Sequence, residues 1–171
     1  MKGEDRKEEI LNTAAQLFSE RGYNAVSMRD LAEALGIKAA SLYNHISSKQ
    51  ELLSTLIISV AEAFTTGMNE IISAKTSTVE KLDKVIDLHV KITIENSKAL
   101  YSLNNDWMHL EEDNLQYFEK MREDYEDSFR EIIRKGVGVG EIKSFNIEII
   151  VFSTLSTLRT LYLWYPKQKD I

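Results

Sequence analysis

Hydrogen-bond donors gather in a short stretch of the chain that begins at Lys38. The side chains there that can donate to phosphate oxygens are those of Lys38, Ser41, Tyr43, His45 and Lys49. The neighbouring Ala39 and Ala40 are small enough for a helix to sit deep in the major groove of DNA. Lys49 also lies beside a predicted helix start, whose free backbone N–H groups attract anions. These residues are therefore candidates for contact with DNA.

Three predicted helices position this stretch. Apolar spacing and capping patterns indicate helices over about residues 5–21, 28–35 and 39–45. Gly36 can take the left-handed conformation that a tight turn between the last two requires. The shared core is predicted to contain Leu17, Phe18, Leu31, Leu35, Ile37 and Leu42. This is the pattern of a helix-turn-helix, although a three-helix corner without a partner would have the same spacing.

The rest of the chain also predicts helices and no strand. A Ser48-x-x-Glu51 capping box opens a long helix that ends near Ser73. Further helical spacing covers residues 79–96, 98–110, 115–135 and 145–165, which gives an all-α protein of about eight helices. The glycines between residues 136 and 140 predict a flexible connection, and they do not form a phosphate loop because no strand precedes them.

Charge and composition limit the classes of function. Residues 1–50 carry equal numbers of basic and acidic side chains, so the whole formal charge of −6 falls on residues 51–171. This division is compatible with DNA binding at one end of the molecule. The 171 residues include no cysteine, which excludes disulfides, thiolate zinc sites and cysteine nucleophiles. The charged start of the chain predicts no secretory signal. Glu148 and Arg159 interrupt the longest apolar run, which argues against a membrane-spanning helix there, so we expect a soluble cytoplasmic protein.

The segment from Ile10 to Leu53 resembles the amino-terminal domain of the TetR/AcrR (tetracycline-repressor) family. The similarity lies in the motifs A-x-x-L-F, G-Y, S-M-R-D-L-A, G-I and S-L-Y-N-H-I-x-S-K-x-E-L. The resemblance implies a homodimeric repressor that binds a palindromic operator in double-stranded DNA and is released by a small-molecule inducer. We therefore expect a helix-turn-helix DNA-binding domain over residues 1–48 and a helical ligand-binding and dimerisation domain over residues 49–171.

The resemblance also assigns roles to individual residues. It places phosphate contacts at Ser27, Ser41, Tyr43, His45 and Lys49. It places positions near the bases at Lys38, Ala39, Ala40 and Asn44, with Arg29 on the DNA side of the second helix. Ile46 stands where the family usually has an aromatic residue, and Ala40 where glycine or threonine is frequent. These departures leave the DNA sequence that is read unpredicted.

The carboxy-terminal part resembles the family more weakly. The stretches YEDSFREIIRKGVGVGEI and LYLWYP are similar to a branch whose members often sense acyl-CoA thioesters or other lipophilic metabolites. Family members commonly continue beyond the W-Y-x-P stretch into a further helix that helps to build the dimer.

The last predicted helix has an interface pattern of its own. One stripe contains Ile147, Val151, Leu155, Leu158 and Tyr162. A second stripe contains Ile149, Phe152, Ser156, Arg159 and Leu163. We expect one stripe to pack on its own domain and the other on a symmetry mate, with a central helix of a monomer as the alternative.

A ligand pocket is predicted among the carboxy-terminal helices. Its candidate lining residues are Leu88, Ile92, Leu103, Trp107, Met108, Tyr117, Met121, Tyr125, Leu155, Arg159 and Tyr162. Most aromatic residues at helical spacing serve only as core. Arg159 is the sharpest candidate, because a cation in an apolar stretch needs an anionic partner in the protein or an anionic ligand.

Enzyme functions find little support in the sequence, and we expect no catalytic residue, cofactor or metal. His109, Glu112 and Asp113 could share a helix face, but a solvated charged surface explains them better than a metal site. His89 is isolated on an apolar helix, which is typical of a satisfied buried histidine. Two alternatives to an inducible repressor stay open. One is a binding or enzymatic protein that keeps the three-helix head as a scaffold, and the other is an activator, or a repressor that acts without a small ligand.

Overall fold

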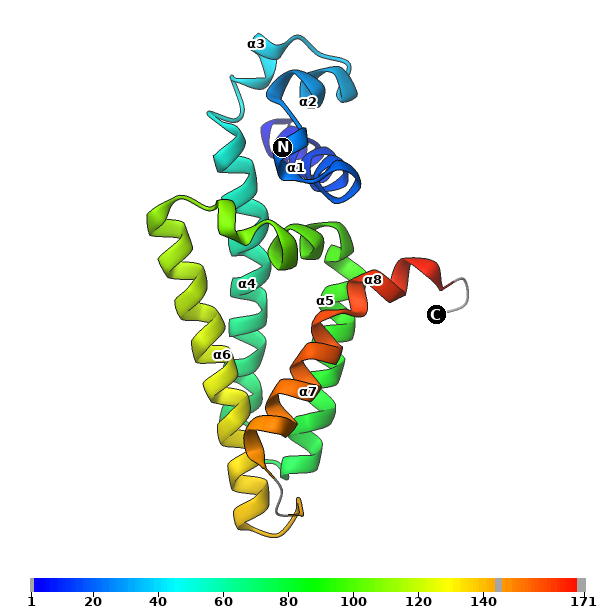
Figure 1. The fold of residues 1–171 in the computed structure, drawn as a ribbon. Helices are drawn as coiled ribbons and strands as arrows, with labels where there is room; N and C mark the ends of the chain where they lie inside the picture. The colour runs from blue at the N-terminus through cyan, green and yellow to red at the C-terminus, as the bar shows by residue number, and fades with distance from the viewer. Residues whose placement is uncertain (1, 144–145, 169–171) are drawn as a thin grey trace. The chain divides into compact units, whose positions relative to one another are not determined.

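The computed structural model describes residues 2–143 and 146–168, and the side chains from Asp5 onward within these ranges. The described backbone is helical with no strand, which confirms the all-α prediction (Figure 1). Its elements are α1 (Lys2–Arg21), η1 (Tyr23–Ala25), α2 (Met28–Ala34), α3 (Ala39–Leu42), α4 (Lys49–Ser73), α5 (Thr78–Asn105), η2 (Trp107–His109), α6 (Glu112–Gly138), α7 (Ile147–Arg159), α8 (Leu161–Trp164) and η3 (Tyr165–Lys167).

The chain folds into two compact units, and the division differs from a cut at residue 48. The first unit consists of Met1–Val60 and Lys98–Gln116, and the second of Ala61–Ser97 and Tyr117–Ile171. The first turns of α4 belong to the first unit because Leu52, Leu53 and Ile57 are fully buried there. Three long helices, α4, α5 and α6, each contribute residues to both units.

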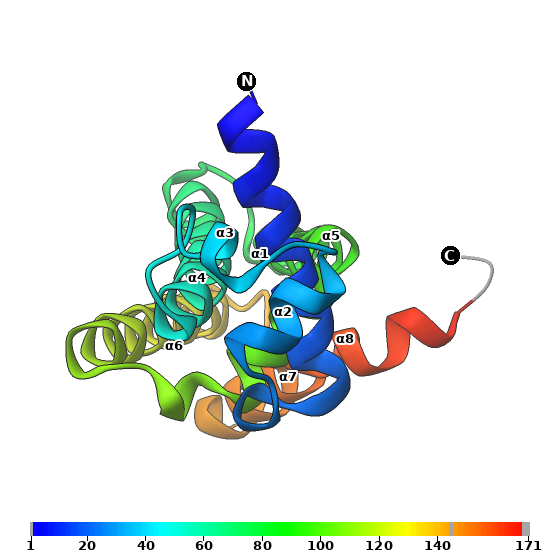
Figure 2. The ribbon, with the colours of Figure 1, turned by 90° about the horizontal axis from the view of Figure 1, so that it is seen from above.

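The head of the first unit consists of α1, α2 and α3, and local signals set its helix ends (Figure 2). The predicted capping box opens α2: the Ser27 side chain accepts from the N–H of Asp30 at 3.2 Å, and the Asp30 carboxylate accepts from the N–H of Ser27 at 2.7 Å. Gly36 follows α2 with a left-handed φ of 65°. Phe18, Leu31 and Leu42 are completely buried, as expected for the shared core.

Helix α3 is shorter than the sequence predicts. It ends at Leu42, and the predicted range of 39–45 continues as turns in which the N–H groups of His45 and Ile46 donate to the carbonyl oxygen of Leu42. Leu42 and Ile46 are both buried, so these turns pack against the core although they are not helical. The chain must redirect here before α4 begins at Lys49.

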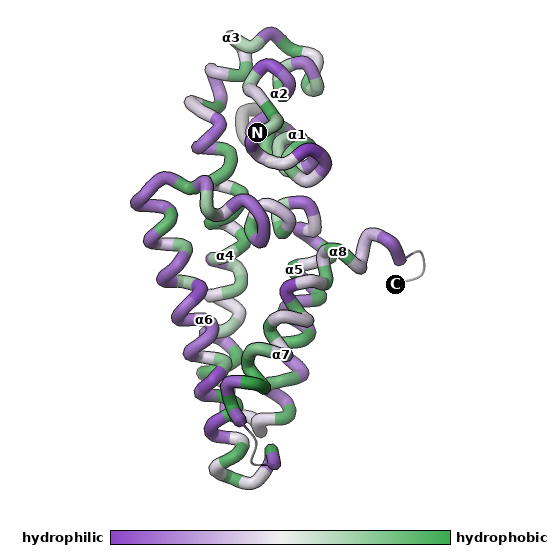
Figure 3. The backbone as a smooth tube through the Cα atoms, viewed as in Figure 1, coloured by the Kyte–Doolittle hydropathy of each residue, from purple (hydrophilic) through white to green (hydrophobic). Residues whose placement is uncertain are grey.

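The second unit is a bundle of parts of α4, α5 and α6 together with α7 and α8. Its buried cluster includes Met68, Val85, Phe129, Ile133 and Leu155, with one or more from each long helix. Hydrophobic segments recur along α7, whereas α6 alternates between hydrophilic and hydrophobic ones (Figure 3). On length and composition alone, Lys49–Ser73 and Ile147–Lys167 could cross a membrane, but each directs apolar side chains into the protein core.

Two predicted boundaries in this unit need correction. The break expected at residue 97 is a kink inside α5, where Asn96 leaves helical geometry with φ −134° and ψ 28°. The flexible connection predicted at residues 136–140 does not begin at Gly136, because α6 continues to Gly138. A Cβ atom at Gly136 would lie 2.5 Å from Cγ2 of Thr78, so glycine permits the close approach of α6 to the start of α5. The predicted start of the last helix at Phe145 lies outside the described residues.

Candidate nucleic-acid interface and ligand-binding core

The structure gathers most of the predicted DNA-binding residues on α2, α3 and the turns that follow. All but Lys49 of this set are exposed: Ser27, Arg29, Lys38, Ala39, Ala40, Ser41, Tyr43, Asn44 and His45. Tyr43 is 52 % exposed, unusually high for a large aromatic residue in a folded head. The surface therefore offers hydroxyl, amide, imidazole and cationic donors around a very short helix, a set that matches DNA phosphates and base edges.

Lys49 differs from the other predicted contacts because the protein already binds its ammonium group. Its Nζ donates to the carbonyl oxygens of Tyr23 at 2.9 Å and Val26 at 2.8 Å. The same atom lies 4.0 Å from the centre of the Tyr23 ring, within cation–π distance. Burial lowers the pKa of Lys49. Lys49 therefore joins the turn after α1 to the start of α4, and its predicted phosphate contact stays a prediction.

Lys49→Met is expected to destabilise the protein by about 1–3 kcal/mol, because two carbonyl oxygens lose a charged donor. Urea unfolding followed by circular dichroism measures this change. Lys38→Met is the matched control: its side chain is exposed, so stability should stay unchanged while DNA affinity falls. Unchanged stability in Lys49→Met would contradict the structural role of the two carbonyl contacts.

The segment Lys98–Gln116 supports the head from within the same unit. The ring of His109 stacks on that of Tyr23 with centroids 5.5 Å apart, and Nε2 of His109 lies 3.2 Å from Nδ2 of Asn24. Gln50 Nε2 donates to the carbonyl oxygen of His109 at 2.6 Å. Asp106 is also buried here, and burial raises its pKa. Sequence reasoning considered His109 only as a possible metal ligand and missed this contact with the head.

Among the described residues, no group of His, Cys, Asp or Glu side chains is arranged to hold a metal ion.

The predicted pocket residues fall in both units. Leu103, Trp107 and Met108 belong to the first unit, and the other eight to the second. In the second unit the buried members are Ile92, Met121, Tyr125, Leu155 and Tyr162. Leu88 and Arg159 are half-buried, whereas Tyr117 is exposed and its hydroxyl donates to Oε1 of Glu62 at 3.1 Å. The pocket as a whole stays a prediction.

A polar cluster lies within the apolar core of the second unit. His89, only 4 % exposed, has its Nε2 atom 3.0 Å from the hydroxyl oxygen of Tyr125. The Phe64 ring packs against both, with centroids 4.7 Å from His89 and 5.9 Å from Tyr125. The hydrogen bond confirms the expectation of a satisfied buried histidine. Burial and the positive charge of Arg159 lower the pKa of His89 to about 3, and burial raises the pKa of Tyr125.

The pKa of His89 makes stability depend on pH. The unfolded chain binds a proton below its ordinary value of 6.5, whereas the folded protein does so only near 3. The free energy of unfolding should therefore decrease as the pH falls from 6.5 towards 3, by up to about 1.4 kcal/mol per pH unit. His89→Leu should flatten this dependence in urea titrations, and His45→Leu, on the exposed head, should keep it. An equal slope in His89→Leu and the parent protein would contradict the burial of a neutral imidazole.

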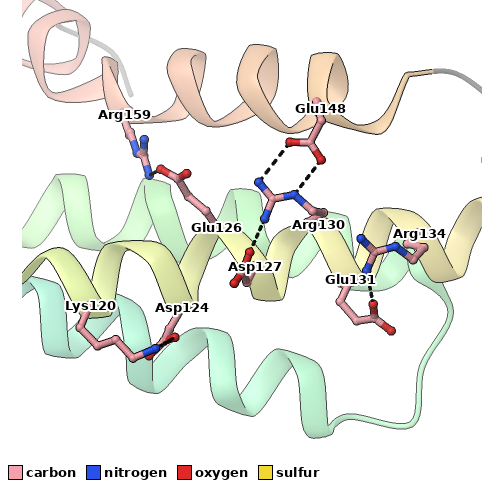
Figure 4. Close-up of polar contacts among 9 residues, drawn as sticks. All are labelled: Lys120, Asp124, Glu126, Asp127, Arg130, Glu131, Arg134, Glu148 and Arg159. Atoms are coloured by element: carbon pink, nitrogen blue, oxygen red, sulfur yellow. Dashed lines mark hydrogen bonds and ion pairs between the residues drawn. The ribbon is translucent and has the colours of Figure 1, made fainter.

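Arg159 has an anionic partner within the protein. Its Nη2 atom donates to Oε1 of Glu126 on α6 at 2.7 Å (Figure 4). Near the other end of α7, Glu148 accepts from Nε of Arg130 at 2.8 Å and from Nη2 at 3.1 Å. Helix α7 is thus joined to α6 by one ion pair near each end.

The two stripes of the last helix differ in exposure as expected. Val151, Leu155, Leu158 and Tyr162 of the first stripe are buried, and the first three belong to the core cluster of their own unit. In the second stripe Ile149 is 51 %, Phe152 74 % and Leu163 48 % exposed, while Arg159 is half-buried. The structure therefore identifies the first stripe as the one that packs within its own domain. Contact of the second stripe with another copy stays a prediction.

These features define an all-helical protein with a helix-turn-helix head that carries exposed donors. The family model described as bacterial regulatory proteins, tetR family, matches residues 10–56. The model described as tetracyclin repressor-like, C-terminal domain, matches residues 75–168. The chain belongs to the TetR family of DNA-binding transcriptional regulators.

Named relatives agree with this assignment. The HTH-type transcriptional repressor KstR2 of Rhodococcus jostii is 24 % identical over 162 residues, covering 94 % of this chain and 79 % of the relative. The TetR-family regulator PfmR of Thermus thermophilus is similar in structure, with a TM-score of 0.83, 28 % identity and coverage of 94 % of this chain and 88 % of that one. AibR in complex with isovaleryl coenzyme A and operator DNA matches with a TM-score of 0.81, 24 % identity and coverage of 96 % and 90 %.

Proposed function

We propose that this protein is a cytoplasmic, dimeric transcriptional repressor that a small lipophilic or acyl-CoA-like ligand releases from a palindromic operator. The observation that carries the proposal is the exposed donor set around α3, with Tyr43 at its centre. A dimer would place two such helices in major-groove sites about one helical turn apart. AibR, a structural neighbour, is described with both isovaleryl coenzyme A and operator DNA, which supports the pairing of these two partners.

Ligand control would work through differential affinity. A ligand shifts the balance between DNA-bound and released states only if it binds one of these states more tightly. Helix α4 follows α3 directly in the chain and contributes residues to both units, so it is the element expected to carry the change from ligand to head. Operator affinity that does not change at a saturating concentration of a bound ligand would contradict this mechanism for that ligand.

The first experiment is a salt series of binding to the DNA upstream of the protein's own gene, with a scrambled duplex of equal length as the control. We expect sequence-selective binding whose logarithm decreases steeply with the logarithm of the salt concentration. Weak binding without preference to this DNA and to a genomic selection library would favour the scaffold alternative.

Tyr43→Ala tests the same surface at one residue. Loss of an exposed phosphate donor should weaken operator binding about tenfold, while the free energy of unfolding stays within about 0.5 kcal/mol of the parent protein. Fluorescence anisotropy with labelled operator measures the affinity. Tyr117→Ala is a matched control because it removes another exposed tyrosine outside the head. Equal operator affinity in both variants would show that Tyr43 does not contribute to operator binding.

A further inference from the structure

Tyr23, in the turn between α1 and α2, contacts three other segments of the first unit. Its side chain is only 6 % exposed. The Phe18 ring of α1 meets the Tyr23 ring edge-on with centroids 5.3 Å apart, and the His109 ring of η2 stacks on it at 5.5 Å. Nζ of Lys49, at the start of α4, donates to the carbonyl oxygen of Tyr23 at 2.9 Å. Side chains from outside the turn therefore fix its position.

The turn itself covers residues 22–26 and has two buried anchors. Tyr23 and Val26 are buried, whereas Asn24 and Ala25 between them are exposed. The N–H of Val26 donates to the carbonyl oxygen of Tyr23 at 3.3 Å, which is long for a backbone hydrogen bond. The placement of the turn thus depends on the two anchors and on the groups that contact them.

This turn leads directly into the predicted DNA-binding surface. Val26 is followed by Ser27, which caps α2, and Arg29 lies in the first turn of that helix. Both Ser27 and Arg29 are exposed members of the predicted DNA-binding set. Contacts with DNA need donors held within fractions of an ångström of their acceptors, so a displaced turn would misplace the start of α2.

The protein holds His109 in place at both its backbone and its ring. Nε2 of Gln50 donates to the carbonyl oxygen of His109 at 2.6 Å, and the N–H of His109 donates to the carbonyl oxygen of Asp106 at 2.9 Å. Nε2 of the imidazole lies 3.2 Å from Nδ2 of Asn24, so the ring contacts two consecutive residues of the turn. A side chain fixed in this way is a firm support for Tyr23.

We propose that His109 is a positioning residue for operator binding. By stacking on Tyr23, it keeps residues 22–26 in the arrangement that places the start of α2 for contact with DNA. Without its ring, the turn would take this arrangement for only a fraction of the time, and the apparent dissociation constant would rise by the inverse of that fraction. The inference rests on the proposed operator binding and adds to it a residue from outside the helix-turn-helix.

The test is fluorescence anisotropy with labelled operator over a salt series, on the whole protein and corrected for the folded fraction. His109→Ala should weaken binding about tenfold at fixed salt. The slope of log affinity against log salt should not change, because no phosphate contact is lost. His109→Phe should restore the affinity to within about twofold of the parent protein, because its ring can stack on Tyr23. A purely structural role would lower the free energy of unfolding and leave the affinity of the folded protein unchanged.

A double-mutant cycle tests whether His109 acts through Tyr23. In a Tyr23→Leu background, His109→Ala should have no further effect on operator affinity, because the two substitutions remove the same contact. Met108→Ala is the matched control: Met108 precedes His109 on the same short helix and is 56 % exposed, so the affinity should stay parental.

Four results would overturn the proposal. They are parental affinity in His109→Ala, a salt slope shallower by about 0.9, which would indicate a direct phosphate contact, binding by His109→Phe as weak as that of His109→Ala, and an undiminished effect of His109→Ala in the Tyr23→Leu background. Selective binding by the parent protein in the same assay keeps a failure here distinct from a failure of the repressor proposal.

Discussion

Phe152→Asp should convert the proposed dimer into monomers and weaken operator binding by about a hundredfold or more. Phe152 is 74 % exposed and lies on the α7 stripe with Ile149, in the middle of the surface proposed to contact a second copy. A buried, unpaired carboxylate opposes association there. A monomer also loses the second half-site, whose binding is effectively intramolecular in a dimer.

Sedimentation equilibrium and operator titration measure the two effects. Val139→Asp is the matched control, because Val139 has a similar exposed fraction of 71 % but directly follows the end of α6, outside α7. It should remain dimeric with parental affinity. A Phe152→Asp protein that stays dimeric would show that the dimer contact does not involve the exposed stripe of α7.

Leu42→Ala should abolish operator binding at concentrations at which the parent protein is saturated. Leu42 is the buried residue of the four-residue helix α3 and has no exposed surface. Its truncation should cost about 2–5 kcal/mol, and the loss falls on the contact that fixes the reading helix. The expected protein keeps its helical second unit but does not hold α3 in place.

Leu155→Ala separates this local effect from general destabilisation. Leu155 is 2 % exposed in the core of the second unit, so the same substitution should cost a similar free energy. Its folded fraction should still bind the operator. Urea unfolding and anisotropy on both variants make the comparison. If Leu42→Ala bound the operator as well as Leu155→Ala, α3 would not be the reading element.

Local signals in the sequence were sufficient for most of the helix ends in and next to the head. The Ser27 and Asp30 capping box, the turn at Gly36 and the start of α4 at Lys49 all depend on residues within one turn of each other. The length of α3 was wrong because its end depends on redirecting the chain towards α4, which helical spacing does not encode. The capping box at α4 was also only partly correct: Ser48 accepts from the N–H of Glu51, but the Glu51 carboxylate binds Ser47.

Contacts between distant residues were the part that the sequence did not supply. The sequence pattern predicted that Lys49 contacts a phosphate. It did not predict the contacts of Lys49 with the carbonyl groups of Tyr23 and Val26, because those residues are distant in the sequence. For the same reason the sequence did not predict the stacking of His109 on Tyr23 or the hydrogen bond between His89 and Tyr125. For Arg159 physical chemistry alone required an anionic partner in the protein or an anionic ligand, and the structure identified Glu126 as a partner in the protein.

The division of the chain has a consequence for protein engineering. The portable module of this regulator is discontinuous, because residues 98–116 belong with residues 1–60. A chimera that joins residues 1–48 to another sensor would carry every exposed donor around α3 but would leave the stacking partner of Tyr23 behind. A transplant that includes both segments keeps the ring of His109 and the amide of Gln50 together. Chimeras between relatives should therefore exchange both segments as one set.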